Sequence, residues 1–308
     1  MPPGGRLVSI GLPVRNGERH VGEAARSVLA QSYGPLELVI SDNASDDATE
    51  DICRDLARSD ARVRYCRQPR NIGLVENFTA VLHLARGTYF KWLGADDRLL
   101  PSYVSRCVEV LDADADLVLV TTQQAHVDPD GIVETARYDA TGLRSARPVE
   151  RFTELLRLLN ESHLLLDPLY GMMRREPVSR LSRPVMLFED QILAARLALT
   201  GPFGHVPEVL SYRGAQPFPR LPATAVKLGV PRWQARVATA LQCRELLSAV
   251  REAGLGRDER RRAEAVVVRF FVRRHQVTAV RRGRRLARRL WPLQRSLSGT
   301  SAVLKGGR

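Results

Sequence analysis

Short apolar runs alternate with longer stretches of helical spacing over the first two hundred residues. The apolar runs predict buried strands, and we expect the first of them to be stopped by Pro13. The predicted strands are residues 7–12, 36–40, 63–66, 89–93, 117–122, 169–173 and 206–212. The predicted helices are residues 18–31, 45–56, 75–85, 101–111, 151–159 and 189–199. This alternation is typical of βαβ units and predicts an α/β, Rossmann-like fold whose mostly parallel central sheet is flanked by helices.

Two turn-rich segments and a helical C-terminal part complete the predicted pattern. The Asp-Pro-Asp-Gly run at 128–131 predicts a hairpin-type turn, and the proline-rich residues 217–222 predict a linker. Two further helices are predicted over residues 233–250 and 258–281. We therefore expect an α/β domain over residues 1–215 and a helical region over residues 216–308, flexible after about residue 293.

The net charge of +13 is concentrated in the helical region. Residues 1–220 carry 26 basic and 29 acidic side chains, whereas residues 221–308 carry 21 basic and 5 acidic ones. Valines and phenylalanines at positions 266, 267, 270 and 271 share one helix face, with arginines around the rest. This basic amphipathic pattern over residues 265–291 is compatible with an anionic membrane surface, with a helix packed on the α/β domain or an acidic protein partner, or with nucleic acid. The few aromatic side chains disfavour nucleic acid.

Residue spacing and missing motifs disfavour disulfide scaffolds, structural zinc sites, dinucleotide-type oxidoreductases and P-loop NTPases. The four cysteines have no zinc-type or CxxC spacing, the six histidines do not cluster, and there is neither a GxGxxG nor a GxxxxGK[ST] motif. No apolar run approaches the roughly 18 residues of a membrane span. The first residues lack the pattern of a secretory signal, so we expect a cytoplasmic protein.

Polar side chains follow the ends of the first four predicted strands. They are Arg15, Asn16 and Glu18 after the first strand, Asp42 and Asn43 after the second, Asn71 and Gly73 after the third, and Asp96 and Asp97 after the fourth. Ligands of open α/β sheets bind beyond the carboxyl ends of the strands. Any one of these segments is equally typical of a solvated turn, but four at one edge predict a binding crevice.

Two acidic pairs are candidates for chemistry. Asp96 and Asp97 follow an apolar strand, and adjacent carboxylates there suit Mg²⁺ or Mn²⁺, which are held by one or two carboxylates plus substrate phosphates. The alternative for this pair is a cap before the next helix. Glu189 and Asp190 open a predicted helix, where an acidic pair is also favoured by the helix dipole alone.

Seven segments, in chain order, resemble motifs of family 2 glycosyltransferases. They are VSIGLPVRNGE at 8–18, SDNASDD at 41–47, RNIGLVEN at 70–77, GADD at 94–97, LYGMMRR at 169–175, FED at 188–190 and VPEVLSYR at 206–213. Each segment is weakly specific, whereas the ordered set over about residues 7–213 is strongly so.

The resemblance implies a GT-A fold and inverting transfer of a sugar from a nucleotide-diphosphate sugar, with a UDP-sugar favoured. It implies donor binding in about residues 1–100 and acceptor binding in about 101–215. The donor-binding positions would be Pro13, Arg15, Asn16, Glu18, Asp42, Asn43, Asn71, Gly73, Asp96 and Arg213, with Asp42 on the base or ribose. Asp97, helped by Asp96, would bind the metal. Asp190 would be the general base, and Glu189 would orient Asp190 or the acceptor.

Two positions depart from the family pattern. Gly94 stands where the metal motif has its first carboxylate, and no histidine follows Arg213, which leaves a third metal ligand in doubt. The family also implies a glycan or lipid-linked acceptor, and the basic helix is compatible with a peripheral position at the inner face of the cell membrane. The alternatives are a nucleotide-sugar-binding protein without catalysis, and a membrane or nucleic-acid adaptor that uses the basic helix.

Overall fold

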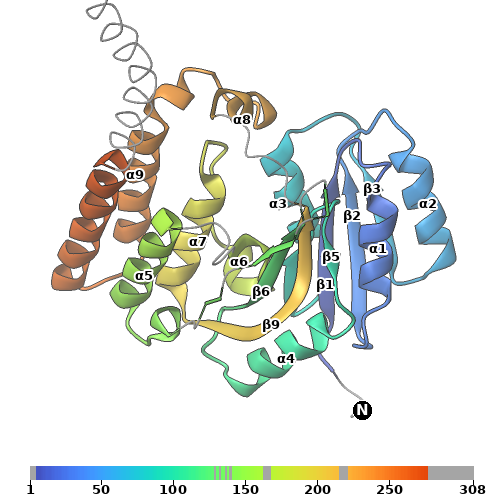
Figure 1. Ribbon diagram of the computed structural model, residues 1–308, viewed down its shortest axis with the longest axis horizontal. Coiled ribbons are helices and arrows are strands. Elements are labelled where there is room, and N and C mark those ends of the chain that lie inside the picture. Colours follow the sequence, from blue (N-terminus) through green and yellow to red (C-terminus); the bar gives the residue numbers. More distant parts are fainter. Residues whose placement is uncertain are drawn as a thin grey trace, which may run out of the picture.

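The computed structural model describes residues 5–127, 130–131, 133–135, 137–138, 141–161, 168–214 and 221–276. In this part of the chain nine strands form one sheet, in the order β3-β2-β1-β4-β8-β6-β9-β5 with β7 paired to β6 (Figure 1). Their bounds are β1 Val8–Val14, β2 Leu36–Asp42, β3 Val63–Arg67, β4 Tyr89–Trp92, β5 Arg98–Leu99, β6 Leu119–Val127, β7 Val133–Thr135, β8 Met172–Arg174 and β9 Phe203–Gly214.

Helices connect most of these strands. They are α1 Val21–Leu29, α2 Thr49–Ser59, α3 Leu74–Leu84, α4 Tyr103–Ala113, α5 Pro148–Glu161, α6 Arg175–Ser179, α7 Glu189–Thr200, α8 Leu221–Lys227 and α9 Gln234–Glu252, with short 3-10 turns η1 Gly142–Arg144 and η2 Pro168–Tyr170. Residues 257–276 form one more helix, called here the C-terminal helix. Most paired residues are in parallel register, so the predicted α/β fold with a mostly parallel sheet is confirmed.

The first strand continues through Pro13 to Val14, so the prediction that Pro13 stops it is wrong. The carbonyl of Gly11 accepts a hydrogen bond from the β4 side, and the carbonyl of Val14 accepts one from the β2 side. Because backbone groups alternate along a strand, Pro13 faces the β4 side, as Gly11 does. Pairing with β4 ends at Gly11, so the missing N–H of Pro13 leaves no ladder bond unmade.

Two other predicted segments differ from the structure. The strand predicted over residues 169–173 is divided into η2 and the three-residue β8, which pairs antiparallel with β4 and β6. Part of the predicted linker, residues 221–222, opens α8. Residues 128–129, 215–220 and the predicted tail after about residue 293 lie outside the described residues, although β6 and β7 do pair antiparallel.

Apolar side chains cover both faces of the sheet. In β2, Leu38 and Ile40 belong to a cluster with α1, α2 and α4, whereas Val39 points to the other face and joins a cluster with α3, α5 and α7. This is the two-residue alternation expected of a strand that is buried on both faces. The sheet is thereby held between two helical layers, and the strand ends remain available for a site.

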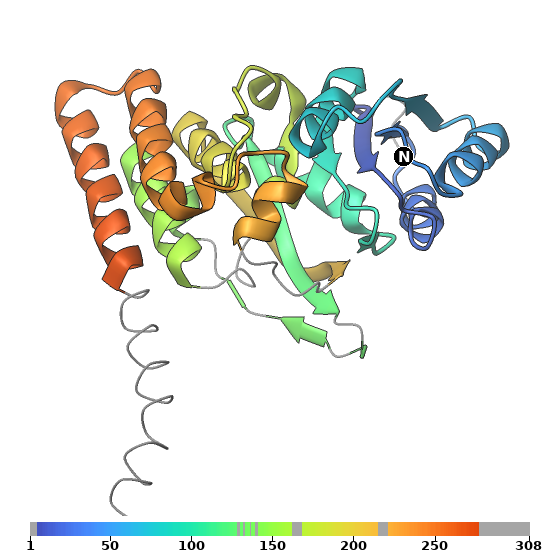
Figure 2. The same cartoon turned by 90° about the horizontal axis from the view of Figure 1, so that it is seen from above.

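The C-terminal helix packs on the second of these layers. Val266, Val267 and Phe270 are buried in the same cluster as α5, α7 and α9, and Figure 2 shows α5, α9 and this helix side by side. Apolar residues that the sequence placed on one face therefore contact the protein itself. The division of the chain at residue 215 stays a prediction. No helix among the described residues is long and apolar enough to span a bilayer.

Candidate functional site

The order of the strands reverses between β1 and β4. The chain adds β2 and β3 on one side of β1 and then places β4 on the other. Because these four strands are parallel, Val14 lies beside Asp42 and Gly11 beside Trp92, and the loops after β1, β2 and β4 emerge at one edge. Such a reversal is where open α/β sheets bind their ligands.

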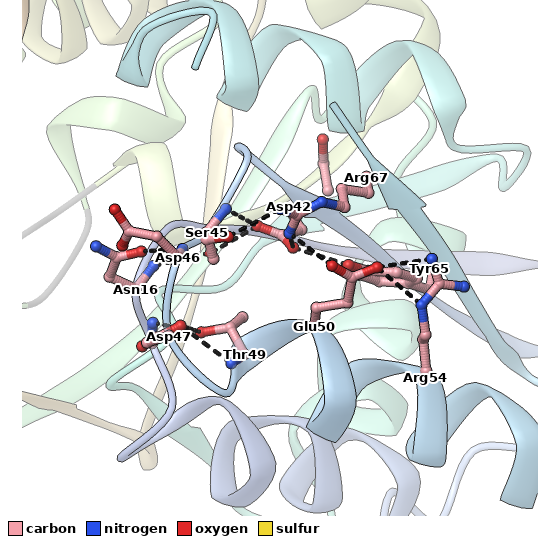
Figure 3. A network of polar contacts seen from close by, with 12 residues as sticks. Asn16, Asp42, Ser45, Asp46, Asp47, Thr49, Glu50, Arg54, Tyr65 and Arg67 are labelled. Atoms are coloured by element: carbon pink, nitrogen blue, oxygen red, sulfur yellow. Dashed lines mark hydrogen bonds and ion pairs between the residues drawn. The ribbon is translucent and has the colours of Figure 1, made fainter. Parts of the chain in front are cut away.

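Asp42 ends β2, and its carboxylate is fully buried. One oxygen accepts hydrogen bonds from the backbone and hydroxyl of Ser45 at 2.9 and 2.6 Å. The other accepts from the Tyr65 hydroxyl at 2.7 Å and from Arg67 Nη1 at 2.8 Å (Figure 3). A carboxylate offers about four acceptor positions, so Asp42 is fully engaged within the protein. Its expected contact with a base or ribose stays a prediction, and in this structure Asp42 organises the loop after β2.

Burial acts to raise the pKa of the Asp42 carboxyl, but the hydrogen bonds from Ser45, Tyr65 and Arg67 outweigh burial and hold it below its ordinary value. The same contact has the opposite effect on its partner. Burial and then the hydrogen bond to Asp42 raise the pKa of Tyr65 well above its ordinary value. The pair is thus a fixed carboxylate and a fixed hydroxyl donor.

The loop after β1 is tied to the loop after β2. The backbone N–H of Asn16 donates to the Ser45 hydroxyl at 2.9 Å, and the Asn16 side chain accepts from the N–H of Asp46 at 3.1 Å (Figure 3). Glu18 accepts from the N–H of Ala48 at 3.1 Å. Arg15 lies 4.0 Å from Asp46 at the exposed rim. The structure therefore brings together the predicted residues of these two strand ends, with Pro13 buried behind them in β1.

The loop after β3 joins the same cluster. The Asn43 amide donates to Asn71 Oδ1 at 2.9 Å and to the Gly73 carbonyl at 3.0 Å, and it accepts from the N–H of Ile72 at 2.8 Å. Gly73 has a φ of 99°, which favours glycine. Asn43, Asn71 and Gly73 were predicted separately and are in direct contact here.

Asp96 and Asp97 converge on a cradle that two glycines leave open. A Cβ atom at Gly94 would lie 2.7 Å from Asp97 Oδ2 and 3.1 Å from Asp96 Oδ1, and one at Gly214 would lie 2.8 Å from Asp96 Oδ2. The departure at Gly94 thus has a physical consequence, since any side chain there would force the Asp97 carboxylate to shift. The capping alternative fails, because the residue that caps α4 is Ser102.

Positive charge surrounds Asp97 in a buried setting. Arg213 Nε lies 3.5 Å from Asp97 Oδ2, and the Arg213 guanidinium lies 3.6 Å from the centre of the Tyr170 ring. Lys91, buried in β4, donates to the Tyr170 carbonyl. Burial raises the pKa of Asp97, the charge of Arg213 opposes that rise, and Asp96 adds to it.

The cradle fits a divalent cation. Its two carboxylates border a cavity of about 210 Å³ that is also lined by Arg213, by Glu23 of α1 and by His20 at the N-cap of that helix. Among the described residues there is no group of three or more histidine, cysteine or acidic side chains placed to hold a metal. Two carboxylates are enough for Mg²⁺ or Mn²⁺ where substrate phosphates complete the ligand shell.

Glu189 and Asp190 form the first turn of α7. Glu189 is buried and accepts hydrogen bonds from Arg183 Nε at 2.5 Å and Nη2 at 3.0 Å. The guanidinium of Arg183 lies 5.3 Å from the Trp92 ring centre in β4, which connects this turn to the strand before the acidic cradle. Glu189 is therefore held by Arg183, and its expected action on the acceptor or Asp190 stays a prediction.

The sequence did not indicate several side chains of this site. They are Tyr65, Arg67, Lys91 and Arg183. Lys91 carried one signal, since a lysine inside an otherwise apolar strand needs a polar partner when buried. The others lie on elements whose contacts with the site arise from tertiary packing.

The sequence matches the family described as Glycosyl transferase family 2 over residues 9–182, more than half of the chain. The chain belongs to glycosyl transferase family 2. This confirms the predicted family. Over 125 residues, 41% of this chain, it is 32% identical to the chondroitin synthase of Escherichia coli and 33% identical to the hyaluronan synthase of Pasteurella multocida. These matches span 18% and 13% of those relatives, so the family 2 chain corresponds to a small part of each.

Solved structures confirm the predicted GT-A fold for this family 2 chain. S. aureus TarS 1–349 in complex with UDP-GlcNAc has a TM-score of 0.64 and 15% identity, covering 86% of this chain and 72% of that one. The mannosyltransferase PcManGT from Pyrobaculum calidifontis, in complex with GDP-Man and Mn²⁺, has a TM-score of 0.55 and 16% identity, covering 92% and 80%.

Proposed function

We propose that this protein is an inverting glycosyltransferase that moves a sugar from a nucleotide-diphosphate sugar to an acceptor hydroxyl. The observation that carries the proposal is the open acidic cradle of Asp96 and Asp97, placed at the sheet reversal and bordered by Arg213. Membership of family 2 supports the reaction type. Neighbours of the same fold bind UDP, UDP-GlcNAc or GDP-Man, which supports a nucleotide-sugar donor.

The donor would lie across the loops after β1, β2 and β3. Arg15, Asn16 and Glu18 border it on one side, and the joined Asn43, Asn71 and Gly73 on the other. Asp42 supports both by holding the loop between them. Arg213 would contact the diphosphate, whose negative charge is complementary to a guanidinium beside the cradle. We favour a UDP-sugar on the family's precedent.

Asp97, with Asp96, would hold Mg²⁺ or Mn²⁺. Such an ion offsets the negative charge that develops on the leaving diphosphate. Two neighbours were solved with Mn²⁺, which supports a divalent ion. The cavity of about 210 Å³ beside both carboxylates would take the ion and phosphate oxygens, and Arg213 would add a second positive charge on the same side.

Asp190 would act as the general base. It takes the proton of the acceptor hydroxyl while that oxygen attacks the anomeric carbon on the face opposite the leaving group. The bond from the anomeric carbon to the phosphate oxygen breaks, and the nucleoside diphosphate leaves with that electron pair. A base of this kind contributes on the order of 10²–10⁴-fold in rate.

A glycan or a lipid-linked molecule is the acceptor class we propose.

The segment over residues 265–291 offers a membrane less apolar area than the sequence indicated, because Val266, Val267 and Phe270 are buried against the protein. The contacts of the described part of this segment support a packed helix on which Arg269 and Arg273 are exposed and Arg274 is half-buried. Residues 277–291 lie outside the described residues.

A thermal-shift screen tests the donor and the metal. UDP-GlcNAc, other UDP-sugars and GDP-Man are each added with and without Mn²⁺, and a donor that binds the folded protein raises the melting temperature. We expect an Mn²⁺-dependent shift in the parent that is absent in Asp97→Asn. The exposed Asp116→Asn serves as the control and should keep the shift. An equal shift in Asp97→Asn and the parent would remove the metal assignment.

Release of the nucleoside diphosphate tests the base. Asp190→Asn should bind the donor as the parent does and lose roughly 10²–10⁴-fold in turnover. A nucleotide-sugar-binding protein without catalysis predicts no turnover in either protein. An adaptor that uses only its basic helix predicts no shift with any nucleotide sugar.

A further inference from the structure

Arg274 of the C-terminal helix reaches the turn that carries Asp190. Its Nη1 donates to Gln191 Oε1 at 3.2 Å and to Gln242 Oε1 at 2.8 Å. Its guanidinium lies 4.6 Å from the centre of the Phe188 ring and 5.2 Å from that of Phe270. One side chain thus contacts the residue before the Glu189–Asp190 pair and the residue after it.

Three elements meet in this contact. Gln242 of α9 is fully buried, and its amide donates to Gln191 Oε1 at 2.7 Å, the same oxygen that Arg274 reaches. Phe188 has a φ of 65°, a left-handed conformation that is costly for an aromatic residue. Backbone of this kind persists where surrounding contacts hold it, and it concentrates at functional sites. Arg274 stacked on the Phe188 ring is one of those contacts.

Electrostatic interactions also relate Arg274 to Asp190. Burial lowers the pKa of Arg274, and interactions with Cys243 and then with Asp190 oppose that lowering. Burial raises the pKa of the Cys243 thiol to about 11, so this α9 side chain is neutral near pH 7. The Glu189 carboxylate is bound by the Arg183 guanidinium. Asp190 is therefore the carboxylate of this turn whose charge acts on the half-buried Arg274.

We propose that Arg274 is a positioning residue for Asp190, which makes the C-terminal helix a part of the acceptor side of the active site. Arg274 holds the turn at residues 188–191 and thereby fixes the position of the carboxylate that accepts the proton. The proposal rests on Asp190 being the base, as proposed above. It gives the C-terminal helix a role in the reaction that its buried apolar contacts alone do not supply.

The test compares Arg274→Gln, Arg274→Lys and Asp190→Asn with a control on the same helix, the exposed Arg273→Gln. The substrate is the nucleotide sugar that gives the largest thermal shift with Mn²⁺, and release of its nucleoside diphosphate is followed. We expect Arg274→Gln to lower kcat by roughly 10–100-fold, with KM for the donor within about twofold of the parent. Arg274→Lys should recover part of kcat, and Arg273→Gln should match the parent.

A double-mutant cycle separates positioning from general destabilisation. If Arg274 acts through Asp190, Arg274→Gln has no further effect on kcat in the Asp190→Asn protein. An equal loss in both backgrounds, or a parental kcat in Arg274→Gln, overturns the inference while the base assignment stands. A parental kcat in Asp190→Asn instead overturns the proposed base. Melting temperatures of the variants show whether a loss of kcat follows a loss of folded protein.

Discussion

The Tyr65 hydroxyl donates a hydrogen bond of 2.7 Å to the buried carboxylate of Asp42. Tyr65 belongs to β3 at the edge of the sheet, and Asp42 ends the neighbouring strand β2. The other oxygen of that carboxylate holds Ser45, whose hydroxyl in turn accepts from the N–H of Asn16. The conformation of the loops after β1 and β2 therefore depends on side chains of the edge strand β3.

Tyr65→Phe removes this donor and leaves the shape of the side chain in place. A buried carboxylate that loses a hydrogen-bond donor costs about 1–3 kcal/mol of folding free energy. We expect a loss in that range by urea denaturation, together with weaker donor binding in the thermal-shift screen. Tyr33→Phe is the control, because the Tyr33 hydroxyl bonds to the Arg6 carbonyl at an exposed position. Equal stability of the two variants would show that the Asp42 network is unimportant for folding.

Stability should fall in acid through Asp42. Its pKa in the folded protein lies below the ordinary value of 3.8, so its ionised form is favoured by folding. The resulting stabilisation is complete above the unfolded pKa and is lost as the pH falls through the lower folded pKa. The free energy of unfolding of the parent should exceed that of Asp42→Asn by a constant amount above about pH 5, and the difference should shrink below pH 3.8. A difference that does not change with pH would contradict the lowered pKa.

Gly94→Ala tests the acidic cradle without removing a carboxylate. The added Cβ would lie 2.7 Å from Asp97 Oδ2, so Asp97 and Asp96 have to move apart. We expect Mn²⁺-dependent donor binding to weaken by about tenfold or more, which is about 1.4 kcal/mol. Gly34→Ala is the matched control, since a Cβ there meets nothing within 4 Å. The measurement is a donor titration with and without Mn²⁺, and parental affinity in Gly94→Ala would exclude the cradle as the metal site.

Local pattern was sufficient to find the polar residues that follow the first four strands, because they are contiguous in sequence with a buried strand, although it ended the first strand too early at Pro13. The parallel order of β1, β2 and β4 then brings Asn16, Asn43 and Asp97 to one edge. The partners of these residues were not predictable in this way. Arg274 bonds to Gln191 across 83 positions, and only packing of the C-terminal helix on α7 brings them together.

Asp42 shows a second limit of sequence reasoning. Its position after a strand indicated a ligand contact, yet its four acceptor positions are taken by Ser45, Tyr65 and Arg67. The tyrosine and arginine alternate with Cys66 along β3, so their direction toward Asp42 follows from the strand's register against β2. The register of β3 against β2 could not be predicted from one short apolar segment of sequence.

The Arg183–Glu189 pair gives a prediction for the turn that carries Asp190. Their side chains are 5% and 8% exposed, so each charge depends on the other for compensation. Removing one partner of such a buried pair costs about 3–5 kcal/mol, whereas replacing both costs much less. We expect Arg183→Met to lose that amount by urea denaturation, and the double variant with Glu189→Leu to recover most of it. Arg180→Met, at the exposed pair with Glu176, should change stability by less than about 1 kcal/mol. Additive losses in the double variant would mean that Arg183 stabilises the protein through its stacking on Trp92 and Phe78, and that Glu189 is free to act on the acceptor.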